Sequence, residues 1–418
     1  MRPLGAVRSN LKKCRSSRSR QQNERDEEEL LYKGDACIIG GGLMGLSTAY
    51  YLSKAGKTVV LLEQREIGNG ASGACDDMIL LQSKKPGVTL KLAIDSLALY
   101  RDLNRELQYD IGFSTHGGMI LIQNKKELDV MERYVQKQRS CGLEVSIVDQ
   151  KELRKRQPYV NTDIYASTYS SVDSQVDPLR LMRALLRYSA EHGMKVFRHA
   201  PVSKVEQKGD HWLVCAGDAI QVECDCVVNA AGAWASQIGK LTGLQIPIEP
   251  RKGQLAITEQ VPPVGETNVW SAAYIASKID PSLAPERSEY AKSIGLGFSF
   301  TQTHDGNYLI GSTRESAGFD KTTSQRAIAD IVKQACYYFP ILKSVNLIRT
   351  IAGFRPASKD GLPIVGAVDQ LPGYYICAGH EGDGVALAPI TGKNMAELIT
   401  TGTCDRRFDE LNLRRFSA

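Results

Sequence analysis

Residues 35–63 read DACIIGGGLMGLSTAYYLSKAGKTVVLLE, and this stretch decides the fold. A short apolar run at 36–39 leads directly into Gly40, Gly42 and Gly45, which match the pattern G-x-G-x-x-G. In this pattern the first glycine makes a tight turn, the second lets the backbone approach a pyrophosphate, and the third lets the helix pack closely on the strand. The stretch therefore predicts a turn that binds a dinucleotide.

The elements around this turn occur in the order that the motif requires. A helix is expected from about Leu43 to Ala55, followed by a second strand at 58–62. Glu63 comes next, 18 residues after Gly45, where a carboxylate accepts hydrogen bonds from ribose hydroxyls. At this point NAD and FAD fit the pattern equally well.

The composition is that of a globular protein large enough for two domains, with 418 residues, 42% hydrophobic and 24% charged. The net charge of +5 comes largely from residues 1–23, which hold seven basic residues and no acidic residue. Their Arg and Ser content fits a transit peptide, but we favour an unstructured tail because charge blocks without apolar periodicity rarely fold. No apolar run is long enough for a transmembrane segment.

The ten cysteines are scattered, and most stand in apolar, strand-like surroundings. This usage suits a reducing compartment, so a cytoplasmic location is expected. Cys224 and Cys226 have the spacing of a C-x-C pair, which is a candidate for metal binding. No second pair or histidine stands at zinc-site spacing, and no metal site is predicted.

Two more turns of small residues follow strand-like runs. The run at 225–229 opens onto Ala230–Trp234, and the run at 374–377 opens onto the glycine-rich stretch 379–384. A helix is expected from there to about Thr400. Three glycine-rich turns are therefore expected around one site.

Residues 246–344 have a different pattern. Three segments in this region, 253–258, 298–302 and 308–311, alternate apolar and polar side chains. This alternation favours an antiparallel sheet that is covered on one face. Residues 353–366 are expected to form a turn-rich stretch that leads into a strand.

Five short motifs occur at wide spacing: VNAAGAW at 228–234, GST at 311–313, GFRP at 353–356, DGLPIVG at 360–366 and GH at 379–380. Together they resemble the D-amino acid oxidase superfamily of FAD-dependent amine oxidoreductases. The resemblance covers nearly everything from Ala36 to Gly402. Within the superfamily the chain is most similar to glycine oxidase, the C subunit of hydrogen cyanide synthase, and the FAD subunits of D-hydroxyproline and opine dehydrogenases.

The resemblance implies an α/β fold, in which a Rossmann-like FAD-binding domain is interleaved with an α+β substrate domain built on an antiparallel sheet. The FAD-binding domain is expected at 32–85, 175–245 and 345–402, and the substrate domain at 86–174 and 246–344. Residues 1–31 and 403–418 are expected to be tails.

The resemblance also implies FAD rather than NAD. The helix that begins near Gly384 would aim its amides and positive dipole end at the flavin N1/C2=O edge. Close relatives often have a neutral residue where Asp383 stands, so its carboxylate is expected to point away from the ring, as a helix cap. The residues expected to bind FAD are Gly40, Gly42, Leu43, Met44, Gly45, Glu63, Gln64, Gly70, Ala71, Ser72, Val202, Ala231, Gly232, Trp234, Gly353, Gly382, Asp383, Gly384 and Val385.

Some relatives attach the flavin covalently. They use a cysteine in the segment before the Asp-x-x-Pro element, or a histidine in the early glycine loop. Here the first position is Gly353, and residues 69–78 contain no histidine. Noncovalent FAD is therefore expected.

Two residues are predicted to act on the substrate. Arg355 matches the family arginine that binds the substrate carboxylate, and a guanidinium offers a planar fork for that purpose. The alternative is an ion pair within the protein. Tyr274 resembles an active-site tyrosine of enzymes like glycine oxidase, and its alternative is packing in the core.

Three other residues were considered for catalysis. His380 would be a base, but we favour a turn residue whose ring is fixed by backbone hydrogen bonds. Lys252 and His304 have weaker claims.

The leading hypothesis is an FAD-dependent dehydrogenase or oxidase of a small amino acid or secondary amine, such as a D-amino acid, glycine, proline or hydroxyproline. It would transfer hydride from Cα to flavin N5, and either O2 or a partner would reoxidise the flavin. The alternative is an FAD-carrying subunit of a multi-subunit amine or opine dehydrogenase, inactive without its electron-transfer partner. Nucleic-acid binding through the basic tail is disfavoured, because the charge is confined to that tail.

Overall fold

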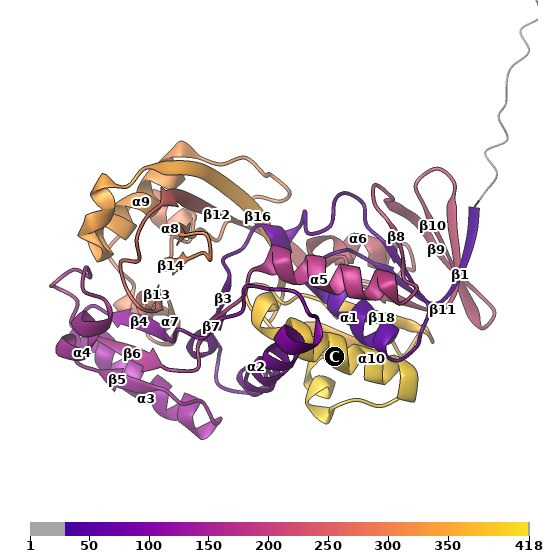
Figure 1. Cartoon of the computed structure of the whole chain (residues 1–418), viewed down its shortest axis with the longest axis horizontal. Coiled ribbons are helices and arrows are strands. Elements are labelled where there is room, and N and C mark those ends of the chain that lie inside the picture. The colour runs from indigo at the N-terminus through magenta and orange to yellow at the C-terminus, as the bar shows by residue number, and fades with distance from the viewer. Residues whose placement is uncertain (1–29, 417–418) are drawn as a thin grey trace, which may run out of the picture.

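The computed structural model describes residues 30–416, which form two lobes, each built on one eight-stranded sheet (Figure 1). The predicted N-terminal tail or transit peptide, residues 1–29, lies outside the described residues, as do residues 417–418. The mixture of parallel and antiparallel strands with helices confirms the predicted α/β fold class.

The first sheet carries the glycine turn. Its main path runs β17-β18-β11-β1-β2-β8, and β10 and β9 extend it from β11. Neighbouring strands along this path are parallel, except that β17 and β18 are antiparallel. The strand bounds are β1 Leu30–Ile39, β2 Val59–Leu62, β8 Lys195–Phe197, β9 Val202–Lys208, β10 His211–Ala216, β11 Ile220–Asn229, β17 Ile364–Ala367 and β18 Tyr374–Ala378.

The first strand begins earlier than the sequence pattern indicated. Leu30 already pairs with Ile220, and β1 follows β11 in parallel register as far as Ile39. The apolar run at 36–39 marks only the buried half of this strand, because residues 30–35 are polar or exposed. The predicted tail of 1–31 is therefore two residues too long at its C-terminal end.

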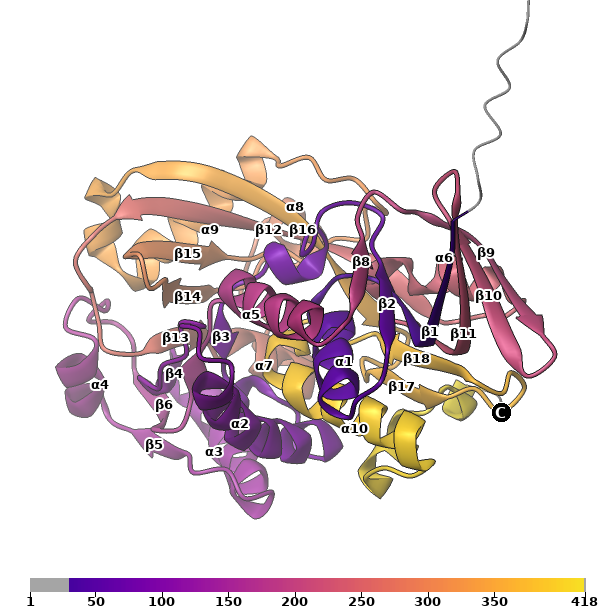
Figure 2. The ribbon, with the colours of Figure 1, turned by 45° about the vertical axis from the view of Figure 1, so that its right-hand side comes forward.

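Helices α1 (Leu43–Lys54), α2 (Val88–Glu106) and α10 (Gly384–Thr401) pack together beside the first sheet, as Figure 2 shows for α1 and α10. A Cβ atom placed on Gly392 of α10 would lie 2.5 Å from the backbone carbon of Ser47 in α1. The two helices therefore touch through their backbones. Since both helices begin at glycine-rich turns, this packing fixes the two turns relative to each other.

The second sheet runs β16-β12-β15-β14-β13-β4-β6-β5. Its pairs are antiparallel, as predicted, except that β13 and β4 are parallel. The bounds are β4 Gly118–Ile122, β5 Ser146–Val148, β6 Ala166–Ser170, β12 Ile248–Gln260, β13 Asn268–Ser271, β14 Ser299–Gln302, β15 Asn307–Gly311 and β16 Leu347–Ser358. A small third sheet pairs β3 (Met78–Ile79) with β7 (Ser174–Gln175).

One prediction about this sheet is wrong. The sequence predicts a turn-rich stretch at residues 353–358, but they form the second half of β16, paired with β12 from Gly253 back to Ile248. Gly353 and Pro356 are tolerated there because β16 is an edge strand, where a missing donor costs little. Residues 347–358 therefore belong with the second sheet and not with the 345–402 segment of the first lobe. The domain division otherwise stays a prediction.

Seven further α-helices complete the described part of the chain. Helix α5 begins as predicted, with Asp177 accepting hydrogen bonds from the amides of Leu179 and Arg180 at 2.9 and 3.0 Å. The bounds are α3 Lys125–Ser140, α4 Gln150–Arg156, α5 Pro178–Glu191, α6 Ala235–Lys240, α7 Ala273–Ile279, α8 Glu289–Ser293 and α9 Gln325–Tyr338.

The C-terminal segment is not a free tail, at least as far as residue 416. Short 3-10 helices span Arg406–Leu411 and Leu413–Phe416. Phe408 and Leu411 are buried against the first lobe, and Arg415 lies 2.7 Å from Asp360. These two apolar side chains, three residues apart, attach this basic segment to the first lobe. Within residues 30–416, no helix has the length and apolar character needed to cross a bilayer.

Candidate active site

A single cavity of about 930 Å³ reaches from the first sheet to the second. In the first lobe it is lined by the ends of β1 and β2 and by the turns after β11 and β18. In the second lobe it is lined by residues of β12 and β16. Every residue predicted to bind cofactor or substrate lines this cavity, with the exception of Gly45. Side chains and turns more than three hundred residues apart in sequence therefore share one site.

Gly45 has a packing role. A Cβ atom at this position would lie 2.0 Å from the Gly40 carbonyl oxygen and 3.2 Å from a methyl group of Ile38. Only glycine lets α1 start this close to the end of β1, which is the role the sequence motif predicts. Gly40 itself has φ +118° and faces the backbone of Ala230, so the first two turns are in contact.

Glu63 stands at the end of β2 and holds the glycine turn. Its Oε2 atom accepts a hydrogen bond from the Gly41 amide at 2.7 Å, and its Oε1 atom accepts one from the Arg65 amide at 2.9 Å. Each carboxylate oxygen has a second lone pair that remains available to a ribose hydroxyl. Val202 and Gln64 line the same part of the cavity.

Helix α1 presents its first turn to the cavity. Its N-cap residue, Gly42, makes no side-chain cap. Instead the Ser72 hydroxyl accepts a hydrogen bond from the Leu43 amide at 3.0 Å. Amides at a helix start attract anionic groups, and the absence of a side chain on Gly42 leaves room for a phosphate.

A second helix start, that of α10, reaches the same cavity. Asp383 occupies its N-cap position but makes no side-chain cap. Its carboxylate lies 2.7 Å from Lys84 Nζ. The expectation that Asp383 caps the helix is therefore wrong, because the buried ammonium of Lys84 is the stronger partner. Lys84 was missed from sequence, since nothing near it in the chain indicates a contact with residue 383.

These features fit FAD. A cavity of this volume is lined by a carboxylate for the ribose, by an uncapped helix start for the pyrophosphate, and by a second uncapped helix start for the flavin. A Cβ atom on Gly353 would lie 2.7 Å from that of Ala74, so the segment after the early glycine loop runs close against β16. Two segments that are distant in sequence therefore pack against each other in the wall of the cavity.

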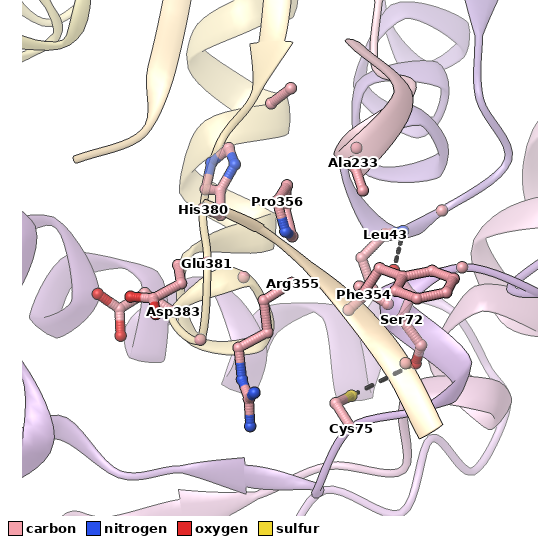
Figure 3. Close-up of a pocket in the computed structure, with 18 of the residues that line it drawn as sticks. Leu43, Ser72, Cys75, Ala233, Phe354, Arg355, Pro356, His380, Glu381 and Asp383 are labelled. Carbon is pink, nitrogen blue, oxygen red and sulfur yellow. Dashed lines mark hydrogen bonds between the residues drawn. The ribbon is translucent and has the colours of Figure 1, made fainter. Parts of the chain in front are cut away.

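Cys75 is the cysteine that lines this cavity. Its thiol lies 3.4 Å from the Ser72 carbonyl oxygen, which it can donate to (Figure 3). Burial, reinforced by Asp76 and Asp77, raises the pKa of this thiol well above its ordinary value. A protonated, hydrogen-bonded thiol is a poor nucleophile, in keeping with the prediction that FAD is held noncovalently.

Arg355 extends from β16 into the cavity, on the side opposite to His380 (Figure 3). Its Nη1 atom donates to the Thr313 carbonyl oxygen and its Nη2 atom donates to the Ser312 hydroxyl, both at 2.9 Å. Among the described residues no carboxylate oxygen lies within 4.0 Å of it. Burial, followed by the nearby Arg314 charge, lowers the pKa of Arg355 to about 10. Glu381 and Asp76 act on this guanidinium from farther away, but the predicted alternative of an internal ion pair finds no partner among the described residues. Arg355 can therefore pair with an anionic ligand.

Tyr274, on α7, also lines the cavity and is partly exposed. It lies outside the hydrophobic clusters of the second lobe, although Trp270 and Ile275 beside it belong to one of them. Its ring is approached by the Arg314 guanidinium, with the Cζ atom 4.2 Å from the ring centre. The alternative of core packing does not describe this residue. Arg314 was missed from sequence, although it directly follows the GST motif at 311–313.

His380 lines the cavity but is fixed as a turn residue. It is 3% exposed, and its Nε2 atom lies 3.2 Å from the Thr391 hydroxyl. Burial lowers the pKa of His380 to about 4, so it is neutral and weakly basic near pH 7. The expected backbone hydrogen bonds to the ring are absent from the described contacts, and a side-chain hydroxyl of α10 takes their place.

The two weaker candidates lie outside the cavity. Lys252 is buried and lies 2.7 Å from Asp320. His304 is exposed beside Asp305. Between Leu30 and Phe416, no group of three or more His, Cys, Asp or Glu side chains is placed to hold a metal ion.

The fold and the cavity together define a two-lobed dinucleotide-dependent oxidoreductase. A family model described as FAD dependent oxidoreductase (DAO) matches residues 35–398. The chain belongs to this family, and FAD is its cofactor. The predicted family, cofactor and enzyme class are confirmed.

Individual relatives are similar over nearly their whole length. Hydrogen cyanide synthase subunit HcnC of Pseudomonas aeruginosa is 29% identical over 87% of this chain and 92% of its own. Glycine oxidase of Geobacillus kaustophilus is 27% identical over 88% and 94%. Among solved structures, L-proline dehydrogenase from P. horikoshii superposes with a TM-score of 0.83 at 25% identity, over 93% of this chain and 99% of its own.

Proposed function

We propose that this flavoenzyme oxidises a small amino acid or secondary amine that carries a carboxylate next to the reacting carbon. Bound FAD supplies the oxidant, accepting a hydride at N5. The observation that carries the proposal is Arg355, a partly buried guanidinium in the cavity with no carboxylate within 4.0 Å among the described residues. Glycine oxidase, HcnC and L-proline dehydrogenase, to which the chain is similar, point to glycine and proline as the first substrates to test.

The chain's own residues would position the substrate. Arg355 would hold the carboxylate, and its hydrogen bonds to Ser312 and Thr313 keep the fork from rotating. With a pKa of about 10 it keeps its charge at pH 7. Tyr274 would line the same end of the cavity. Fixing the carboxylate fixes which Cα hydrogen faces the flavin, so this contact would set the choice between D- and L-substrates.

The cofactor contacts are proposed as predicted, with one change. Gly40, Gly42 and the α1 start would hold the pyrophosphate, Glu63 the ribose, and the α10 start the flavin. Gly45 would act through packing, since its Cβ position is filled by the Gly40 carbonyl oxygen at 2.0 Å. The electron acceptor would be O2 or a partner protein.

The test is anaerobic reduction of the bound flavin. The purified holoenzyme is mixed with glycine, sarcosine, proline, hydroxyproline and a panel of D- and L-amino acids, and the oxidised flavin absorbance is followed before air is admitted. The expected result is bleaching by at least one carboxylate-bearing amine. A protein that binds no flavin, or a flavin that stays oxidised against the whole panel, rejects the proposal.

A second candidate is the FAD-carrying subunit of a larger complex. One of the similar proteins is named as a subunit. The exposed end of the edge strand β16 carries Leu347 and Ile348, which are 39% and 62% exposed. Apolar side chains beside a free strand edge suit a protein partner. Size-exclusion chromatography of the isolated chain decides: turnover with hydrogen peroxide formation by a monomer or homodimer excludes an obligate partner.

A cytoplasmic location is proposed on the cysteines. The nine cysteines in the described part of the chain are all unpaired, and four of them are buried. Unpaired cysteines suit a reducing compartment. Fractionation of the producing cells, with the protein followed by antibody, tests this location.

A further inference from the structure

The cavity holds a second arginine that the proposed reaction of a simple amino acid does not use. Arg314 directly follows Thr313, whose carbonyl oxygen accepts the hydrogen bond from Arg355. The Arg314 side chain is 16% exposed and lines the cavity. Its Nε atom is buried and has no hydrogen-bond partner. Two guanidinium groups, one from β16 and one from the segment after β15, thus face one cavity.

A third cation contacts the same tyrosine ring as Arg314. Lys278 Nζ is 4.3 Å from the centre of the Tyr274 ring, and the Arg314 Cζ atom is 4.2 Å from the same centre. Both side chains line the cavity. Tyr274 therefore contacts two cations through its ring, and a cation–π contact leaves the charge of each in place.

The acidic side chains at this end make no hydrogen bond with either guanidinium group. Glu381 Oε1 lies 3.9 Å from Arg314 Nε, which is too long for a hydrogen bond, and 3.8 Å from Arg251. That carboxylate oxygen is itself buried without a hydrogen-bond partner. Asp76 also lines the cavity; burial raises the pKa of its carboxyl, while Arg355, Lys84 and Arg314 act to lower it. Among the described residues, the hydrogen-bond donors of Arg314 therefore remain available to an anionic group of the ligand.

We propose that Arg314 recognises a second anionic group, so that the preferred substrate is an amine with two carboxylates. The claim that such an amine is oxidised rests on the proposed function. The claim that Arg314 binds a second anionic group does not. Arg355 takes the carboxylate next to the reacting carbon, and Arg314 takes the other. The second carboxylate stands either on the N-substituent, as in an N-carboxyalkyl amino acid, or on the side chain, as in aspartate and glutamate.

The reaction balances with FAD as the oxidant. The Cα–H bond breaks and its electron pair passes to the flavin as hydride, while the nitrogen loses a proton and a C=N bond forms. Water adds to that bond and the C–N bond breaks. An N-carboxyalkyl amino acid then yields an oxo acid and an amino acid, whereas aspartate or glutamate yields a dicarboxylic oxo acid and ammonia.

The direct test uses ligands that cannot be oxidised in this way. Oxydiacetate carries two carboxylates around an ether oxygen, and methoxyacetate carries one. Each is titrated into the holoenzyme by calorimetry and by perturbation of the flavin spectrum. The variants are Arg314→Gln and Arg314→Lys. The matched control is Arg251→Gln, because Arg251 also lies near Glu381 but does not line the cavity.

Wild-type enzyme is expected to bind oxydiacetate at least about tenfold more tightly than methoxyacetate, as for one charged hydrogen-bonded contact. Arg314→Gln should reduce this ratio to about one while leaving the methoxyacetate affinity within about twofold, and Arg314→Lys should keep part of it. Arg251→Gln should leave the ratio unchanged. Equal affinities in wild type, or an equal loss for both ligands in Arg314→Gln, overturns the inference.

Oxidisable ligands separate this inference from the proposed function. Iminodiacetate, sarcosine and both enantiomers of aspartate and glutamate are mixed anaerobically with the holoenzyme. Reduction by iminodiacetate places the second carboxylate on nitrogen, and reduction by aspartate or glutamate places it on the side chain. If no amine reduces the flavin but oxydiacetate binding still depends on Arg314, the proposed function fails and the second anion site stands. If sarcosine reduces it faster than every dicarboxylate, the proposed function stands and this inference fails.

Discussion

Lys84 Nζ lies 2.7 Å from the carboxylate of Asp383, joining the segment after β3 to the first turn of α10. The lysine side chain is 4% exposed and the aspartate side chain 30%. The pair places a neutralised carboxylate, and not a bare one, at the helix start that faces the cavity. The positive end of α10 is thereby preserved for an electron-rich ligand.

Breaking this pair should affect both stability and the flavin. Lys84→Met leaves a carboxylate beside the α10 start and is expected to cost about 2 kcal/mol of unfolding free energy and to shift the reduction potential of the bound flavin to a more negative value. Asp383→Asn leaves the more deeply buried lysine unpaired and should cost more stability. Chemical denaturation and potentiometric titration measure the two effects.

The double variant Lys84→Met/Asp383→Asn should recover much of the loss, because both charges are gone. Lys125→Met serves as the matched lysine control, since Lys125 pairs with Asp129 at the surface, where such pairs contribute little. Additive losses in the double variant, or an unchanged flavin potential in Lys84→Met, would contradict this account of the pair.

Gly45→Ala should destabilise the protein before any cofactor is considered. Its Cβ would lie 2.0 Å from the Gly40 carbonyl oxygen, so α1 must move away from β1. A loss of about 1–3 kcal/mol is expected, as for other overpacked positions, together with weaker FAD binding. Gly382→Ala is the steric control for the thermal stability of the apoprotein, because its Cβ meets no atom within 4 Å. Equal melting temperatures for the two variants would speak against the packing role.

Local rules of backbone geometry explain what the sequence could predict. The glycine turn and the start of α1 could be predicted because side chains are sterically excluded at these positions. Glu63 could be predicted because the motif places a carboxylate at the end of the second strand, where it accepts a hydrogen bond from the turn. The Asp177 cap is a local hydrogen bond, and it is present. The resemblance to a known superfamily then located Arg355, which no local pattern would have singled out.

Contacts between distant segments explain what the sequence could not predict. The path of residues 353–358 depends on β12, a hundred residues away, and not on their own glycine and proline content. The contact of Lys84 with Asp383 and that of Arg314 with Tyr274 also join residues that are far apart in sequence. The wrong prediction for Asp383 has the same cause. A helix cap is a contact within a few residues, which the sequence suggests, whereas the observed partner, Lys84, is distant in the chain.

Stability should fall as the pH rises towards neutrality, owing to two buried carboxylates. Burial raises the pKa of Asp77 and of Asp173 to about 7, from an ordinary value of 3.8. Between these values the folded state holds more protons than the unfolded state. Each group therefore contributes stability that is complete below about pH 4 and is lost as the pH rises through about 7.

Asp77→Asn tests this dependence. Asp77 Oδ1 accepts a hydrogen bond from the Thr301 hydroxyl at 2.9 Å, and an amide oxygen can accept the same bond. Denaturant unfolding at several pH values should show a slope that is less steep in the variant by up to about 1.4 kcal/mol per pH unit. Parallel curves for variant and wild type would mean that Asp77 does not titrate in this range.

The variant Arg355→Met tests whether Arg355 binds the substrate or forms an ion pair that stabilises the fold. Because no carboxylate lies within 4.0 Å of Arg355 in residues 30–416, the variant leaves no buried acid unpaired. The unfolding free energy should fall by about 1–2 kcal/mol, for the two hydrogen bonds to Ser312 and Thr313 that are lost. Thermal denaturation of the apoprotein measures it. A loss of about 3 kcal/mol or more, the signature of a broken buried ion pair, would restore the structural alternative.

The most direct test of the central claim is stopped-flow anaerobic reduction of the bound flavin, comparing each carboxylate-bearing amine with the same amine lacking its carboxylate. Proline is set against pyrrolidine and sarcosine against dimethylamine, in wild type and in Arg355→Met. The account predicts that only a carboxylate-bearing amine reduces the wild-type flavin rapidly, and that Arg355→Met lowers kred/Kd at least about a hundredfold while retaining FAD. Equal reduction by both members of each pair, or an Arg355→Met enzyme as active as wild type, would contradict it.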